Sequence, residues 1–195
     1  FTTRRSYDLW LISIIALAWS LYQLYIVIEP TNSTISRSIH LSFAMVLAFL
    51  IYPMIKKPYF LLKIRWFGYT FATVGLVTAA YISYFYEELA LRPGDYTTLD
   101  IVMAIVAVII LLEAGRRVLG LALSVIAILF LAYDLLGPYM PELIVHKGAS
   151  LNKLAGHMYL TTEGIFGVPL GVSAGFVFLF VLFGSLLDKI GRAHV

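Results

Sequence analysis

A short polar run, followed by glycines and a proline, has the most unusual spacing in this sequence. The run stands directly before residues 165–187, a stretch of about 23 positions without a charged side chain. Such a stretch is long enough to cross the ~30 Å hydrocarbon core of a bilayer as a helix. Pro169 removes a backbone N–H donor, so we expect the helix to be kinked or interrupted there. The candidate motif consists of Thr161, Thr162, Glu163, Gly164, Gly167, Pro169, Gly171 and Ser173.

Glycines recur every four residues in this motif, at Gly167, Gly171 and Gly175. On one continuous helix they would share a face and let another backbone pack closely. The spacing is compatible with two structures. One is a membrane helix with a packing face and a polar start. The other is an interrupted transporter helix, in which small residues let elements slide and broken backbone lines a site.

Few other residues carry chemistry. Ionisable groups within membrane segments are usually functional, but Asp100, Asp134 and Glu163 stand near the ends of apolar segments, and we interpret them as capping or interfacial groups. His146 and His157 have no zinc-binding spacing and are interpreted as surface residues. The sequence has no cysteine, no Gly-x-Ser-x-Gly motif and no phosphate-binding glycine loop. It gives no basis for an enzyme, a metal site or a cofactor.

The composition is that of a polytopic membrane protein. Hydrophobic residues make up 61% of the chain and charged residues 13%, and the mean hydropathy is +0.91. In soluble domains, hydrophobic residues average roughly 45–50% and charged residues about 25%. The net charge of +3 is interpreted as a distribution across the membrane and not as a nucleic-acid patch. The predicted surroundings are membrane lipid, and no nucleic-acid partner is expected.

Apolar segments predict an all-α protein with about six transmembrane helices in an antiparallel up-down bundle. The predicted spans are residues 9–28, 39–55, 66–85, 99–112, 118–136 and 165–187. A short interfacial helix, capped by Ser150, is expected before the last span. Its apolar face would be formed by Leu151, Leu154, Ala155 and Met158.

Two local patterns refine the middle of the chain. Thr97 and Asp100 have the spacing of a capping box that opens the fourth span. Glu113 faces Arg116 and Arg117 at i+3 and i+4, which favours helical continuity. The sequence leaves open whether residues 97–136 form two spans with a tight turn or one bent helix.

Lysine and arginine residues predict the orientation, because they are in excess on the cytoplasmic side. With six spans, nine basic residues fall on one side and four on the other, so we expect a cytoplasmic N-terminus. The first side has Arg4, Arg5, Lys56, Lys57, Lys63, Arg65, Arg116, Arg117 and Lys189, and the second has Arg37, Arg92, Lys147 and Lys153.

Several segments together resemble one transporter family. Residues 160–174 (LTTEGIFGVPLGVSA) and 176–184 (FVFLFVLFG) closely resemble a signature of fused permeases of the tripartite ATP-independent periplasmic (TRAP) transporters, of the type paired with TAXI-class solute-binding proteins. Residues 112–120 (LEAGRRVLG) and 130–139 (FLAYDLLGPY) also look like that family, as does His146-Lys-Gly.

The resemblance implies a secondary-active permease in a bacterial or archaeal cytoplasmic (inner) membrane. It would import small organic acids delivered by a periplasmic TAXI-type binding protein, driven by a sodium or proton gradient. Residues 1–148 would be a small-subunit-like scaffold with five spans, and residues 149–189 the interfacial helix and the first span of the large transport subunit. The remainder of that subunit would be a partner. The motif at residues 161–173 would have a structural role or dock the binding protein.

Two further expectations concern the alternatives and the chain ends. A non-transporting scaffold or sensor domain remains the alternative function, because residues 9–136 carry no buried charge in the predicted spans. Residues 190–195 (IGRAHV) resemble the translation of a sequencing adapter. We therefore expect this tail to be non-native and the chain to be the N-terminal part of a longer protein.

The predicted orientation can be tested by cysteine labelling. A single cysteine at Ser33 or Ala149 should react with a membrane-impermeant thiol reagent added to intact cells. The native chain has no cysteine, so it provides the unlabelled control. Labelling at these positions only after the cells are lysed would contradict the orientation.

Overall fold

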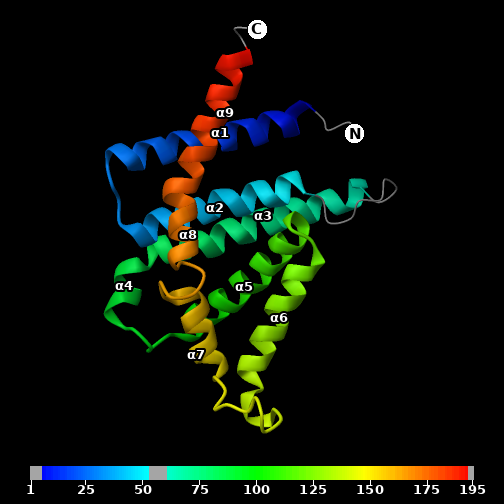
Figure 1. Ribbon diagram of the computed structural model, residues 1–195, viewed down its shortest axis with the longest axis vertical. Helices are drawn as coiled ribbons and strands as arrows, with labels where there is room; N and C mark the ends of the chain where they lie inside the picture. The colour runs from blue at the N-terminus through cyan, green and yellow to red at the C-terminus, as the bar shows by residue number, and fades with distance from the viewer. Residues whose placement is uncertain (1–5, 53–60, 193–195) are drawn as a thin grey trace.

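The computed structural model describes residues 6–52 and 61–192, and within these ranges every regular element is helical (Figure 1). The all-α prediction is confirmed for this part of the chain. The α-helices are α1 (Ser6–Ile28), α2 (Ser33–Ile51), α3 (Leu61–Tyr84), α4 (Tyr86–Leu91), α5 (Thr98–Val118), α6 (Leu121–Leu135), α7 (Leu151–Ala155), α8 (Val168–Val172) and α9 (Phe178–Arg192). Short 3-10 or π segments are η2 (Gly137–Tyr139), η3 (Gly156–Leu160) and η4 (Ser173–Val177).

Four helices of the described chain are long and apolar enough to cross a membrane, which is consistent with a membrane-embedded protein. They are Leu9–Ile28, Ser33–Ile51, Thr98–Val118 and Val168–Gly191. α3 has 24 residues but contains many threonines, tyrosines and glycines, and it is not among the four. α6 is apolar but has only 15 residues. The predicted six spans are therefore confirmed only as four candidates.

The second helix begins earlier than predicted. α2 starts at Ser33 because the side chain of Asn32 accepts a hydrogen bond from the backbone N–H of Thr34, at 2.9 Å, and caps the helix. The predicted end of this span at residues 53–55 lies outside the described residues, as do Arg4, Arg5, Lys56 and Lys57 of the orientation argument.

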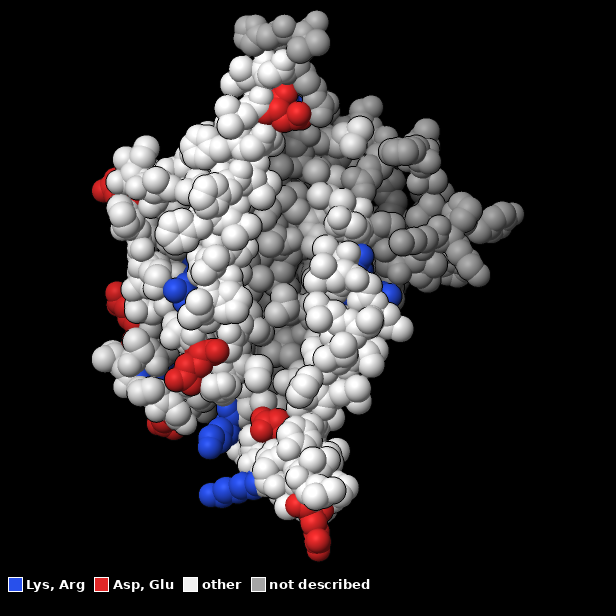
Figure 2. Space-filling view, in the orientation of Figure 1, with Lys and Arg blue, Asp and Glu red and all other residues white. Residues whose placement is uncertain are grey.

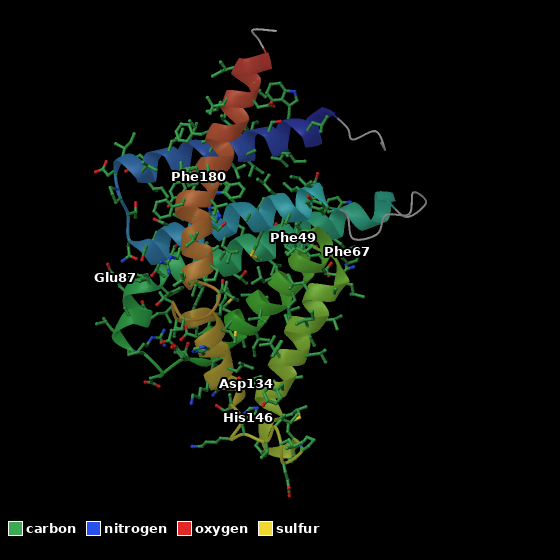
Figure 3. All side chains as sticks on the ribbon, viewed as in Figure 1. Phe49, Phe67, Glu87, Asp134, His146 and Phe180 are labelled. Carbon is green, nitrogen blue, oxygen red and sulfur yellow. The ribbon has the colours of Figure 1, made fainter. Side chains whose placement is uncertain are left out.

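The helices do not form a simple up-down bundle. α1, α2 and α3 lie alongside one another, whereas α8 and α9 run steeply across α1 and α2 (Figure 1). In Figure 3, Phe180 marks this crossing, and Asp134 and His146 lie at the opposite end of the molecule. The up-down order is thus not seen for the last helix. The polar contacts described below hold it in its crossed position.

Small residues form the centre of the core between α2, α3 and α5. Ala79, Ala104 and Ala107 are buried there, and they let the helix backbones approach closely. Met45 and Phe49 of α2 fill the space beside them. By contrast, α1 and α9 expose most of their apolar side chains, so these two helices have an apolar surface for lipid or another subunit.

The link between α5 and α6 is a tight turn, which settles the alternative that the sequence left open. Gly120 has a φ of 98°, in the left-handed region that favours glycine, and it ends the connection between the two helices. The Ser124 hydroxyl then donates a hydrogen bond to the Leu112 carbonyl at 3.0 Å. Residues 97–136 therefore include two separate helices that pack against each other.

Both local patterns in the middle of the chain are confirmed. Thr97 and Asp100 form the capping box of α5. The Asp100 carboxylate is fully buried and also accepts hydrogen bonds from the Tyr81 hydroxyl and from Arg92, whose Nη1 lies 2.9 Å away. The predicted capping group therefore also ties α3 and the end of α4 to α5.

The Glu113 carboxylate accepts hydrogen bonds from both predicted arginines, with Nε–O distances of 2.7 Å to Arg116 and to Arg117. The Arg117 side chain is 1% exposed, and its guanidinium lies 4.8 Å from the Phe49 ring centroid and 5.0 Å from that of Phe71. This arginine therefore connects α2, α3 and α5, and Glu113 compensates its buried charge.

We predict that Glu113→Gln destabilises the fold strongly, because it leaves the buried Arg117 cation without its carboxylate. The loss should be about 3 kcal/mol, measured as the free energy of unfolding in detergent. Glu88→Gln is the matched control, since its 3.9 Å pair with Arg92 is 65% exposed at the glutamate. That substitution should change stability by less than about 1 kcal/mol. Equal effects of the two substitutions would contradict this role of Glu113.

Candidate functional site at the break before the last helix

The helix before the last span is broken at residues 161–167. The π segment η3 ends at Leu160 and α8 begins only at Val168. Pro169 lies in the first turn of α8, where its missing N–H is not needed. The predicted kink or interruption at Pro169 is therefore not seen, because Val168–Gly191 is one continuous helical segment. The break lies before that segment and separates it from η3.

Glycine is required inside the break. A Cβ atom at Gly164 would lie 2.3 Å from the Met158 carbonyl oxygen and 2.5 Å from that of His157. These are backbone atoms, so they cannot move aside as a flexible side chain would. The close approach lets the Ile165 N–H donate to the Met158 carbonyl at 2.8 Å, which closes the turn.

Arg37 of α2 holds the end of the break. Its Nη1 donates to the carbonyl oxygens of Phe166, at 2.7 Å, and of Gly167, at 3.3 Å. Gly171 makes room for this guanidinium, because a Cβ there would lie 2.8 Å from Arg37 side-chain atoms. The sequence predicts Arg37 only as a loop charge. In the structure it donates to the Phe166 carbonyl inside the break and to the Gly167 carbonyl, which also accepts from the Gly171 N–H at 3.1 Å.

An aromatic pair anchors the break from α3. The Phe166 side chain is 1% exposed and packs edge-on against the Tyr159 ring at 5.2 Å. The Tyr159 hydroxyl donates to the Thr78 carbonyl of α3 at 2.5 Å, and burial raises the pKa of this tyrosine. Tyr159 therefore remains a neutral donor across the physiological pH range.

A second group of polar side chains lies where η4 passes α1 and α2. We call Trp19, Gln23, His40 and Ser173 the polar cluster. The Gln23 side-chain amide donates to the Ala174 carbonyl at 2.5 Å and lies 3.0 Å from Nδ1 of His40. Gln23 and His40 are 1% and 3% exposed. Polar groups this deeply buried among apolar helices either bind the helices together or have a functional role.

The hydrogen bonds of the polar cluster assign the protonation state of His40. The Trp19 indole N–H, which can only donate, lies 3.3 Å from Nδ1 of His40. Nδ1 must therefore be an acceptor, and the proton of the neutral imidazole is on Nε2. That atom lies 3.4 Å from the Ser173 hydroxyl. Gln23 Oε1 is buried and has no hydrogen-bond partner among the described residues.

The predicted motif is divided between two places. Ser173 belongs to the polar cluster, and Gly171 contacts Arg37. Thr162 and Glu163 are exposed at the other end of the break, where Glu163 lies 3.1 Å from Nδ1 of His157. Thr161 donates to the His157 carbonyl at 3.0 Å.

The remaining predicted residues have other roles. Gly167 precedes α8 and is not on a helix face, and a Cβ at Gly175 would meet no described atom within 4 Å. The predicted surface residue His146 is half-buried, because its ring accepts from the Gly148 N–H at 3.1 Å and contacts Tyr133. Among the described residues, no group of three or more histidine and acidic side chains could hold a metal ion.

The residues that sequence reasoning missed are Trp19, Gln23, Arg37 and His40. Trp19 and Gln23 are four residues apart on α1, and Arg37 and His40 are three apart on α2, so each pair lies on one helix face. The sequence signal that could have revealed them is the helical spacing of these polar residues in two otherwise apolar segments.

No protein-family model, curated protein or solved structure matches this chain.

We predict that Gly171→Leu lowers the thermal unfolding temperature, because the new side chain displaces Arg37 from the carbonyls of Phe166 and Gly167. A lost hydrogen bond of a charged group to a buried carbonyl costs about 1.5–3 kcal/mol. Gly175→Leu is the matched control on the next turn and should have no destabilising effect, since its surroundings are open. Equal loss of stability in both variants would contradict the role of Arg37.

Proposed function

We propose that this chain is the front part of a TRAP-type secondary permease that imports small organic acids delivered by a periplasmic TAXI-type binding protein. A sodium or proton gradient would drive the import. The observation that carries the proposal is that the helix break at residues 161–167 coincides with the family-like signature at residues 160–174. Non-helical backbone beside membrane helices commonly contributes to the binding sites of secondary transporters.

In this proposal six helical segments cross the membrane, with the N-terminus in the cytoplasm of a bacterium or archaeon. The four apolar candidates would be joined by α3 and α6. α3, with 24 residues, is about 36 Å long and sufficient for the hydrocarbon core. α6, with 15 residues, is about 22 Å long, so its span would include residues beyond the helix.

The two ends of the motif would have different roles. Gly164 and Gly171 provide space for backbone carbonyls and for Arg37, which is a structural role. Thr162 and Glu163 are exposed at the start of the break, on the predicted outer side, where a binding protein would dock. The transport site itself would be completed by the remainder of the large subunit.

A scaffold or sensor domain without transport is the second candidate. Contrary to the prediction, residues 9–136 do bury charged side chains, namely Asp100 and Arg117. The scaffold is favoured because these charges are neutralised inside this chain, with Asp100 paired to Arg92 and Glu113 to Arg117. Neither pair leaves a carboxylate free to bind a transported cation.

Uptake of labelled organic acids into proteoliposomes distinguishes the two candidates. The complete permease, assembled on this chain, is reconstituted with its binding protein, and a sodium or a pH gradient is imposed. We expect uptake that requires both the binding protein and one of the gradients. A folded, correctly inserted protein that gives no uptake with either gradient would contradict transport and favour the scaffold.

Docking at Glu163 is tested separately. Glu163→Lys should weaken the affinity for the binding protein and reduce uptake at low binding-protein concentration, because it reverses an exposed charge at the proposed contact. Glu142→Lys is the matched control, since Glu142 is also exposed and lies in the loop predicted on the same side. Unchanged uptake and unchanged affinity in Glu163→Lys would rule out docking at this position.

A further inference from the structure

An apolar groove lies where α5, α6 and α7 meet. Its volume is about 180 Å³, larger than the roughly 150 Å³ apolar cavity that can hold a benzene ring. In Figure 2 a hollow runs between α6 and the side of the molecule formed by α7, α8 and α9. The groove is lined only by apolar side chains, namely Ile105, Val108, Ile109, Leu112, Leu131, Leu135, Leu151, Leu154, Ala155 and Met158.

A row of side chains on one face of α5, called the α5 stripe, leads from this groove to the positively charged side chain of Arg116. Ile105, Ile109 and Leu112 line the groove, and Arg116 follows on the same helix face at i+11 from Ile105. These positions extend over about 16 Å of helix. That length is close to half of the ~30 Å hydrocarbon core, the depth of one lipid leaflet.

The charge at the end of the stripe is positive. Arg116 donates through Nε and Nη2 to Glu113, at 2.7 and 2.8 Å, and no described residue accepts from its Nη1. Glu113 is also bonded to Arg117, so one carboxylate compensates two guanidinium groups. The Arg116 side chain is 34% exposed, so it can contact a ligand at the surface.

We propose that the groove and Arg116 form a binding site for an anionic phospholipid. One acyl chain lies along Ile109 and Leu112, and a headgroup phosphate oxygen accepts a hydrogen bond from Arg116. A groove of about 180 Å³ has room for part of one acyl chain, and it is too small for a turn of helix, whose diameter with side chains is about 10–12 Å. The predicted orientation places Arg116 at the cytoplasmic leaflet, where anionic lipids are attracted by basic residues.

The site is tested by native mass spectrometry of the purified chain with equal amounts of phosphatidylglycerol and phosphatidylcholine. We expect the protein to retain phosphatidylglycerol about fivefold more than phosphatidylcholine, and Arg116→Gln to remove this preference. The substitution leaves Glu113 paired with Arg117, so the fold should be kept. Ile109→Trp, which adds bulk at an exposed position of the groove, should reduce binding of both lipids.

Lys153→Gln is the matched control, because it removes one exposed positive charge on α7 away from the groove-lining face. It should retain the preference for phosphatidylglycerol. Equal retention of the two lipids by the native chain, or an unchanged preference in Arg116→Gln, would overturn the proposal. A second experiment places a photo-reactive residue at position 109 and cross-links it in cell membranes. Cross-linking to a protein and not to lipid would also overturn the proposal.

Discussion

A helix that breaks inside a membrane protein leaves backbone carbonyl groups that lipid cannot hydrogen-bond, and the rest of this structure depends on how these groups are satisfied. Arg37 donates to the carbonyls of Phe166 and Gly167 at the end of the break, and Gln23 donates to the carbonyl of Ala174 further along, in η4. The donors come from α1 and α2. These hydrogen bonds hold the break and the first half of the last helix against α1 and α2, which that helix crosses.

The same requirement explains the small residues of the motif. Gly164 lies against two backbone carbonyls, and Gly171 lies against the Arg37 guanidinium, so each glycine makes room for a hydrogen-bonded group. The four-residue spacing of the glycines is compatible with a stripe for packing against another helix. Gly167 precedes the helix and Gly175 has open surroundings, so among the described residues the spacing does not mark one continuous packing face.

Features that depend on residues close in the chain could be predicted from the sequence. The capping box at Thr97, the Ser150 cap of α7 and the pairing of Glu113 with Arg116 all join groups within four residues of one another. The sequence also predicts which residues form the apolar face of α7. It does not predict that Leu154 and Ala155 of this face are buried beside α5.

The polar cluster could not be predicted in this way, because Gln23 and Ala174 are 151 positions apart and Arg37 and Phe166 are 129 apart. Helical periodicity carries no information on such contacts. The most direct test of the cluster is the ¹⁵N NMR spectrum of the His40 imidazole in the membrane-reconstituted protein. The structure predicts a neutral ring at neutral pH, with an unprotonated Nδ1 that accepts from Trp19 and Gln23, and a proton on Nε2. A proton on Nδ1, in either a neutral or a charged ring, would contradict the arrangement that holds the last helix in place.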